Sequence, residues 1–271
     1  MCSYMKQVIF TDLDGTLLDR ANYSYAKALP AIERAKEKNI PIVFCSAKTR
    51  AEQEVYRKKL ELFHPFVVEN GGAVFIPSTY FPFQVNHHKV VNDLLVIELA
   101  LPYHKIKELL DNISRENDIR FRTFGKMTAT DITKAAGLSI ELARLAKLRE
   151  YSETIKFDSR GEETKRALEK IKEAGLDWYD GGRFYHIMAK SDKRRAVTVL
   201  IDLYRQLWGQ IRTIGIGDGP NDLPMLSAVD MPILVQKENH TWEKIDLPGL
   251  RRVPGEGPEG WANALKEILE G

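Results

Sequence analysis

The chain has 271 residues, 44% hydrophobic and 29% charged, and its 40 Lys and Arg against 38 Asp and Glu leave a formal net charge of +2. This length suffices for one large domain or two of ordinary size, and the composition is that of a globular protein with a proper core. The balanced charge gives no reason to expect a nucleic-acid or membrane surface, and no apolar run approaches the roughly 20 residues of a membrane span.

Two apolar runs near the N-terminus predict buried strands. Val8 to Phe10 is followed after Thr11 by Asp12 and Asp14, and Ile40 to Cys45 is followed by Ser46, with a helical pattern at 26–39 between the two runs. Strand, helix and strand in this order form a βαβ unit with parallel strands and a right-handed crossover. Asp12 and Ser46 are therefore expected at the same edge of the sheet, where open α/β sheets bind their ligands.

The remaining elements predict a parallel-sheet core that is interrupted by an inserted domain. The first part continues with a helix at 49–60, a strand at 65–68 and a hairpin region at 73–82. The middle part mixes helices (103–117, 128–136, 139–148, 162–174) with strands (96–99, 119–123, 154–157, 176–179, 183–188). The last part has helices at 192–206, 225–229 and 258–269 and strands at 211–216 and 232–235. The predicted fold class is α/β, with a core of residues 1–95 and 190–271 and an α+β insert at 96–189.

Two groups of carboxylates follow predicted core strands. Asp12 and Asp14 lie in the string DLDGTLLD, and Asp218, Asn221 and Asp222 lie in the string GDGPND. Charges crowded at a strand end are costly unless a cation compensates them. Either string alone is compatible with an ordinary acidic turn, but the two together predict an oxygen-ligand site suited to Mg²⁺.

Two further side chains fit a site that binds phosphate. A basic residue is needed because phosphate and carboxylates repel one another, and Lys193 opens the helix that leads back into the core. Lys193 is favoured over Lys190, its competitor three residues earlier. Ser46 places a hydroxyl at the end of the second strand, where a serine by itself is usually only a cap.

The order DxD, Ser, Lys and GDGxND resembles the signature of the haloacid dehalogenase-like (HAD) phosphohydrolases. The resemblance implies phosphoryl transfer through covalent catalysis, with Asp12 as the nucleophile. Asp14 would protonate the leaving oxygen and then deprotonate the hydrolytic water. Ser46 and the next backbone N–H would bind a phosphate oxygen, and Lys193 would be the phosphate-site lysine.

The same resemblance implies the set of metal ligands. Mg²⁺ would be held by Asp12, the backbone carbonyl of Asp14 and Asp218, with Asn221 and Asp222 completing or orienting that shell. An acid at position 14 also favours a phosphatase or a mutase, because the ATPases of the family carry threonine there.

The spacing of these motifs leaves room for an insert between Ser46 and Lys193 but not between Asp12 and Ser46. A mixed α+β insert there resembles the type IIB cap of sugar-phosphate phosphatases, a lid that excludes water. Strings at 46–49, 69–72, 149–151, 181–186 and 257–261 are similar to those of the mannosyl-3-phosphoglycerate phosphatases in that subclass. The substrate-binding residues implied by this similarity are Ala47, Lys48, Asn70, Arg149, Glu150, Gly182 and Arg183. Cationic members of this set suit the glycerate carboxylate, and Glu150 and Asn70 suit sugar hydroxyls.

The resemblance thus implies Mg²⁺-dependent hydrolysis of mannosyl-3-phosphoglycerate to mannosylglycerate, a compatible solute, and phosphate. The expected partner is this small sugar phosphate, with neither nucleic acid nor membrane. Because only Cys2 and Cys45 are present and residues 1–7 lack an apolar stretch, a reducing cytoplasm is the expected location. Glucosyl-3-phosphoglycerate, sucrose phosphate and hexose phosphates stay open as substrates. A phosphomutase and a binding protein on the same scaffold also stay open, although the intact acids and Lys193 argue against the latter.

Overall fold

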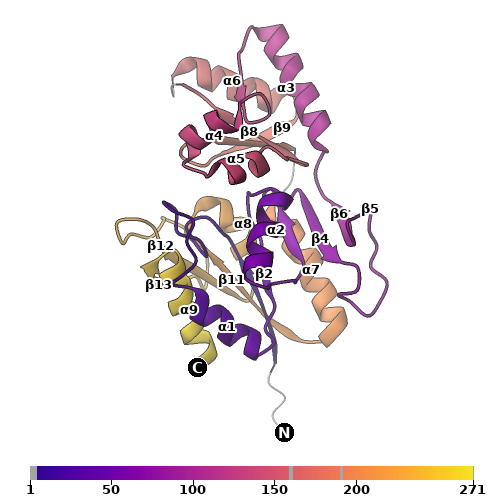
Figure 1. Ribbon diagram of the computed structural model, residues 1–271, viewed down its shortest axis with the longest axis vertical. Helices are drawn as coiled ribbons and strands as arrows, with labels where there is room; N and C mark the ends of the chain where they lie inside the picture. Colours follow the sequence, from indigo (N-terminus) through magenta and orange to yellow (C-terminus); the bar gives the residue numbers. More distant parts are fainter. Residues whose placement is uncertain (1–4, 159–160, 190–191, 271) are drawn as a thin grey trace.

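The computed structural model describes residues 5–158, 161–189 and 192–270 of the chain. It has two lobes, and the first and last described residues both lie in the lower one (Figure 1). Over these residues, none of the helices is both long and apolar enough to cross a membrane. The lower lobe is the core, and the upper lobe is formed by an inserted segment, which we call the cap.

The core is built on a parallel sheet with the strand order β13-β12-β11-β1-β2. Its strands are β1 (Lys6–Thr11), β2 (Ile42–Phe44), β11 (Ile211–Gly217), β12 (Met231–Gln236) and β13 (Arg251–Glu256). One face packs on α1 (Leu29–Glu37), α2 (Arg50–Lys59) and α9 (Pro258–Glu270), and the other on α7 (Lys193–Trp208) and α8 (Leu223–Leu226). Because β1, β2, β11 and β12 are almost wholly buried between these layers, their sequences are nearly continuous apolar runs.

A small antiparallel sheet flanks the core, with the strand order β3-β4-β6-β5. Its strands are β3 (Phe66–Val68), β4 (Ala73–Pro77), β5 (Lys89–Val91) and β6 (Leu94–Glu98). The predicted start of the insert, residue 96, lies inside β6, and β6 pairs with β4 along its whole length. This strand therefore belongs to the lower lobe, and the chain passes to the cap only after it (Figure 1).

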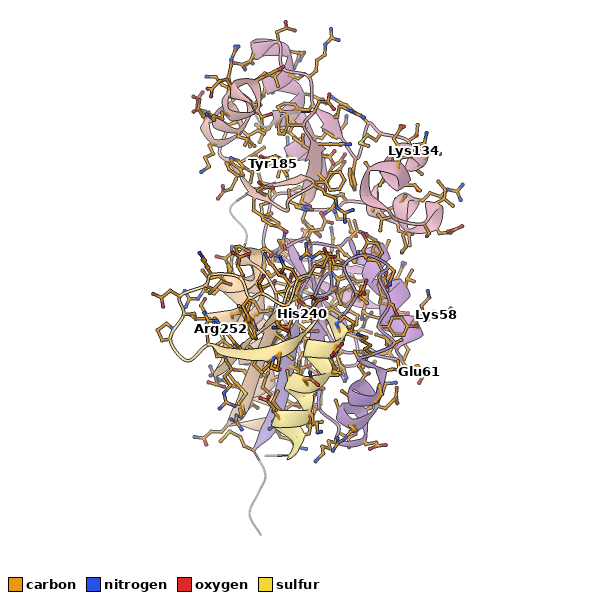
Figure 2. All side chains as sticks on the ribbon, turned by 90° about the vertical axis from the view of Figure 1, so that its left-hand side faces the viewer. Lys58, Glu61, Lys134, Tyr185, His240 and Arg252 are labelled. Carbon is orange, nitrogen blue, oxygen red and sulfur yellow. The ribbon has the colours of Figure 1, made fainter. Side chains whose placement is uncertain are left out.

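The cap has an antiparallel sheet of its own, with the order β7-β8-β10-β9. The strands are β7 (Arg122–Thr123), β8 (Ser152–Lys156), β9 (Leu176–Asp180) and β10 (Tyr185–Ala189). Helices α3 (Tyr103–Asn117) and α6 (Glu162–Glu173) pack on its outer face around Ile155 and Ile187. Helices α4 (Ala129–Ala136) and α5 (Ile140–Ala146) form a second apolar cluster. The α4–α5 pair, which carries Lys134, projects to one side of the cap (Figure 2).

Some predicted elements differ from the structure for local reasons. Helix α8 starts at Leu223 rather than at 225, because the short 3₁₀ turn Pro220–Asp222 leads directly into it. The hairpin region predicted at 73–82 contains only one strand, β4, whose neighbours are β3 and β6. Strands β5 and β13 have no counterpart among the predicted elements, since β5 is short and exposed and β13 contains both proline and glycine.

Candidate active site

Three buried carboxylates meet at the carboxyl edge of the parallel sheet. Asp12 follows β1 and Asp218 follows β11, two strands that pair in parallel, and the backbone N–H of Asp12 donates to Ile216 (2.9 Å). Asp222 ends the 3₁₀ turn that comes next. One carboxylate oxygen of each Asp lies within 4.8 Å of those of the other two. The expectation that both acidic strings lie at one sheet edge agrees with this geometry.

Lys193 is the cation at the centre of this cluster. Its Nζ donates to Asp12 Oδ1 and to Asp222 Oδ1, at 2.7 Å each, and its side chain is 1% exposed. Burial alone would lower the pKa of Lys193, but the adjacent Asp12 and Asp222 raise it well above its usual value. The lysine is therefore a fixed positive charge. The side chain of Asp192 caps this end of α7 by accepting from the N–H of Arg195 (2.9 Å). The competitor Lys190 lies outside the described residues.

Asp218 is held by a residue that the motifs did not indicate. Arg20 Nη2 lies 2.5 Å from Asp218 Oδ2, and the hydroxyl of Thr16 donates to Oδ1 at 3.4 Å. Burial and the neighbouring Asp222 raise the pKa of Asp218 to about 6, against the opposing effect of Arg20. Asp222 takes its orientation from the backbone, because its Oδ2 accepts from the N–H groups of Asp218 (3.0 Å) and Gly219 (3.1 Å).

The loop after β2 places Ser46 and Lys48 beside the acids. The backbone N–H of Lys48 donates to Ser46 Oγ at 3.3 Å, and Lys48 Nζ forms ion pairs with Asp14 (3.0 Å) and Glu52 (3.6 Å). Burial would lower the pKa of Lys48, but Asp14 and Glu52 raise it, so the side chain stays charged. Asp14 is the most open of the acids, with 38% of its side chain exposed. It therefore faces the space where a ligand would lie.

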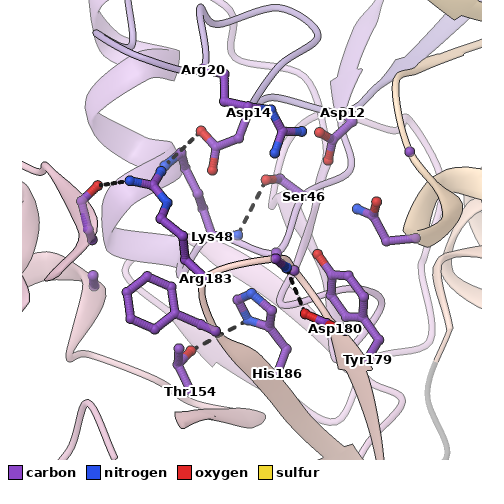
Figure 3. Close-up of a pocket in the computed structure, with 18 of the residues that line it drawn as sticks. Asp12, Asp14, Arg20, Ser46, Lys48, Thr154, Tyr179, Asp180, Arg183 and His186 are labelled. Carbon is purple, nitrogen blue, oxygen red and sulfur yellow. Dashed lines mark hydrogen bonds and ion pairs between the residues drawn. The ribbon is translucent and has the colours of Figure 1, made fainter. Parts of the chain in front are cut away.

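The cap closes over these residues and forms a pocket of about 460 Å³ with the core. Figure 3 shows Asp12, Asp14 and Ser46 from the core facing Arg183 and His186 from the cap. The pocket lining includes, from the predicted site, Asp12, Asp14, Ser46, Ala47, Lys48, Arg149, Gly182, Arg183, Asp218 and Asn221. Lys193 and Asp222 lie directly beneath it through their bonds to Asp12 and Asp218.

Two predicted substrate-binding residues do not line this pocket. Glu150 forms an ion pair with Arg50 at 2.8 Å, and its backbone N–H donates to Glu69. Asn70 follows Glu69 in a left-handed conformation (φ 56°), and its backbone N–H donates to the carbonyl of Ser46 (3.0 Å). Both residues lie at the junction between the lobes.

The cap adds an aromatic wall formed by residues that are not among the predicted substrate-binding residues. Tyr179 and His186 stack with ring centroids 5.0 Å apart and an interplanar angle of 14°, and Thr154 lies 3.5 Å from the imidazole Nδ1. Burial and the nearby cations Arg149 and Lys193 lower the pKa of His186 to about 3, so the ring is neutral. The sequence signal for His186 was its place in the string 181–186, which also contains Gly182 and Arg183.

The donor set fits a divalent cation. Asp12, Asp218 and Asp222 contribute three negative charges, which Lys193 and Arg20 reduce to one (−3 + 2 = −1). These are hard oxygen ligands in a buried site, the kind of donor that Mg²⁺ prefers. A phosphate group would add further negative charge to this cluster, so it would be compatible with the site only if a cation were also bound.

This fold and this cluster define a haloacid dehalogenase-like hydrolase. Residues 9–245 match that family, and the chain belongs to it. A sugar phosphatase of HAD subclass IIB has the same fold (TM-score 0.61, 16% identity, 98% of each chain covered), as does the Thermoplasma acidophilum protein 0175 (TM-score 0.69, 19% identity, 98% of this chain and 99% of the other).

Closer relatives have names that include a substrate. A glucosyl-3-phosphoglycerate/mannosyl-3-phosphoglycerate phosphatase of Methanococcoides burtonii is 44% identical over 266 residues, which is 98% of each chain. A mannosyl-3-phosphoglycerate phosphatase of Pyrococcus horikoshii is 43% identical over 237 residues, which is 87% of this chain and 93% of the other. The similarity therefore covers the cap as well as the core.

Proposed function

We propose that this hydrolase removes the phosphate group of mannosyl-3-phosphoglycerate, and that it also accepts the glucosyl epimer. The observation that carries the proposal is the pocket between core and cap, where phosphatase-type acids face a group of cations. The glucosyl substrate is included because the Methanococcoides burtonii relative is named for both compounds.

Asp12 is the proposed nucleophile. Its Oδ1 is held by Lys193, and its Oδ2 accepts no hydrogen bond from the described residues, which leaves it free to attack phosphorus. A bond forms between this oxygen and phosphorus while the bond from phosphorus to the glycerate oxygen breaks. Asp14, which is the more exposed acid, donates a proton to that leaving oxygen. Asp14 then accepts a proton from the water that hydrolyses the aspartyl phosphate, so that phosphate is released and Asp12 is restored.

The other core residues bind the phosphoryl group or compensate the charges around it. Mg²⁺, bound by Asp12 and Asp218 with Asp222 and Asn221 orienting them, would neutralise the phosphoryl oxygens when it is present. Ser46 and the backbone of Ala47 lie at the end of β2 and are proposed to bind one phosphoryl oxygen. Burial and the neighbouring Asp222 raise the pKa of Asp12, and Lys193 opposes this rise while it holds the carboxylate in place. Lys193 cannot leave its two carboxylate partners without exposing them as unpaired buried charges.

The cap is proposed to recognise the rest of the substrate. Arg183 and Arg149 line the pocket on the cap side and suit a carboxylate, which accepts paired N–H donors. Tyr179 and His186 present a flat aromatic wall suited to the apolar face of a sugar ring. Closure of such a lid excludes bulk water from the phosphoryl group.

Phosphate release from a panel of esters tests the proposal. The panel contains mannosyl- and glucosyl-3-phosphoglycerate, sucrose 6-phosphate and mannose 6-phosphate, each assayed with Mg²⁺ and with EDTA. We expect the two glycosyl-3-phosphoglycerates to have similar kcat/KM values, at least a hundredfold above the others, and EDTA to abolish release. Asp12→Asn should be inactive while it unfolds at an unchanged urea midpoint. Equal kcat/KM for all four esters would overturn the substrate proposal, and an active Asp12→Asn would overturn the mechanism.

A further inference from the structure

The turn at residues 69–72, after β3, lies where the chain crosses between the lobes. The backbone N–H of Leu99, on the way to the cap, donates to the carbonyl of Gly72 at 2.9 Å. A Cβ on Gly71, whose φ is +97°, would lie 2.2 Å from the carbonyl oxygen of Asp192, on the way back to the core. Both crossings thus contact this one turn, and the return crossing leaves no room for a side chain at position 71.

The side chain of Glu69 ties the same turn to the cap. It is fully buried, and its carboxylate accepts from the backbone N–H groups of Glu150 (2.8 Å) and Tyr151 (3.2 Å) and from the hydroxyl of Ser152 (2.5 Å). These donors lie at and just before the start of β8. A single carboxylate of the core therefore holds the first residues of a cap strand.

The backbone of the turn is bound to the loop proposed to bind phosphate. The N–H of Glu69 donates to the carbonyl of Lys48 at 3.1 Å, and the N–H of Asn70 donates to that of Ser46 at 3.0 Å. Glu69 thus connects the Ser46–Lys48 loop on one side with the beginning of β8 on the other.

Arg149 lies at the end of this connection. Its Nη1 donates to the carbonyl of Ala47 (3.0 Å) and to Ser152 Oγ (2.9 Å), and it is 3.6 Å from Glu69 Oε2. The side chain is 5% exposed and lines the pocket, and its Nε is buried without a hydrogen-bond partner among the described residues. The junction therefore fixes Nη1 of the guanidinium, while Nη2, which has no hydrogen bond to the described residues, remains available for an anion.

We propose that Glu69 is a positioning residue that sets Arg149 for the carboxylate end of the substrate. Its carboxylate holds the backbone of Glu150 and Tyr151 and the hydroxyl of Ser152, and Ser152 Oγ in turn accepts from the guanidinium that is bound to the carbonyl of Ala47. The inference rests on the proposed function for the identity of the anion. Its geometry is independent of which sugar the substrate carries.

Glu69→Gln tests the inference, because the amide has the same shape but replaces one acceptor oxygen with a donor. We expect KM for the glycosyl-3-phosphoglycerates to rise about tenfold, with kcat within twofold. For p-nitrophenyl phosphate, which has no carboxylate, both constants should stay within twofold. Arg149→Ala should likewise raise KM for the glycosyl-3-phosphoglycerates without changing the constants for p-nitrophenyl phosphate. In the double variant the KM effect should not exceed that of Arg149→Ala, because the two residues act as one unit. The inference would be overturned if the KM effects of the two single variants multiplied in the double variant, or if activity fell equally with both substrates.

A second readout separates this inference from the proposed function. In assays with p-nitrophenyl phosphate, Glu69→Gln should raise the Ki of glycerate 3-phosphate about tenfold and leave the Ki of inorganic phosphate unchanged. A wild-type enzyme that hydrolyses p-nitrophenyl phosphate but no glycosyl-3-phosphoglycerate would overturn the proposed function only. Equal changes in the two Ki values would overturn the role of Glu69.

Two variants complete the design. Glu153→Gln is the matched control, since Glu153 is an equally buried carboxylate of β8 that accepts from Tyr103 (2.9 Å) and the N–H of Thr154 (2.7 Å). It should leave both Ki values unchanged; a tenfold rise for glycerate 3-phosphate would show a general effect of the cap and overturn the inference. If Glu69→Gln does not fold, Ser152→Ala removes the hydroxyl that links Glu69 to Arg149 and should show the same selective rise in Ki.

Discussion

Trp261 connects the C-terminal helix to the strand that ends at the proposed nucleophile. The indole is completely buried, and its N–H donates to Thr11 Oγ1 at 3.0 Å. The hydroxyl of Thr11 in turn donates to the backbone carbonyl of Asp12 at 2.7 Å. Trp261→Phe keeps an aromatic ring in this space but removes the N–H, so the variant tests what the connection contributes to stability.

The expected cost has two parts. A buried acceptor that loses its donor costs about 1–2 kcal/mol. The missing five-membered ring leaves roughly 40 Å³, which at about 24 cal/mol per Å³ adds about 1 kcal/mol. We therefore expect Trp261→Phe to lower the free energy of unfolding by about 2–3 kcal/mol. Urea titrations should show this as a lower midpoint with an unchanged m value.

Thr11→Val and Trp242→Phe are the controls for this prediction. Thr11→Val removes the acceptor, so the double variant with Trp261→Phe should lose about 1 kcal/mol less than the sum of the single variants. Trp242 is half-buried and donates to the carbonyl of Val253 at 3.2 Å, and its change to Phe should cost about 1 kcal/mol or less. A loss below about 1 kcal/mol for Trp261→Phe, or additive effects in the double variant, would refute the reasoning.

Two further predictions concern titration and metal binding. Burial and the charge of Arg57 lower the pKa of His64, 2.9 Å from the hydroxyl of Tyr80, to about 4. A free histidine has a pKa of about 6.5, so between these two pKa values the unfolded chain binds more protons than the folded protein. From about pH 7 to 5 the free energy of unfolding of wild type should therefore fall by about 1–2 kcal/mol more than that of His64→Gln. Stability curves of the two proteins that run parallel over this pH range would contradict the prediction. Arg20→Ala leaves Asp218 without its cation, so the Kd for Mg²⁺ measured by calorimetry should fall about three- to tenfold, whereas an unchanged or higher Kd would count against the charge balance described above.

The core of the fold was predictable because its strands are buried on both faces. Strands such as β1 and β12 are nearly uninterrupted apolar runs, so their positions follow from hydrophobicity alone. Strand β13, at the sheet edge, has a single well-buried residue, Val253, among charged residues, proline and glycine. Its pairing is imposed by contact with β12 and α9, which no local pattern records.

The acids were predictable for a related reason, and Lys193 through the resemblance to the HAD signature. Parallel strands bring their carboxyl ends to one edge, so residues directly after β1 and β11 must meet. Arg20 could not be predicted in this way, because its contact with Asp218 depends on the path of a loop. Asn70 and Glu150 were interpreted as substrate contacts because of the strings that contain them, yet neither lines the pocket and both lie at the junction of the lobes. A sequence segment that is similar between relatives does not by itself show whether its residues contact the ligand or stabilise the fold around the site.

The groups proposed for chemistry come only from the core, whereas the residues proposed to recognise the rest of the substrate come from the cap. Such a division separates two kinds of evolutionary change. Substitutions around Asp12 would end turnover, but those on the pocket side of residues 103–189 would alter which ester fits while the reaction continues. Selection for a new phosphate ester can therefore proceed through variants that remain active. Enzymes built in this way can change their substrate specificity while they keep the same catalytic residues.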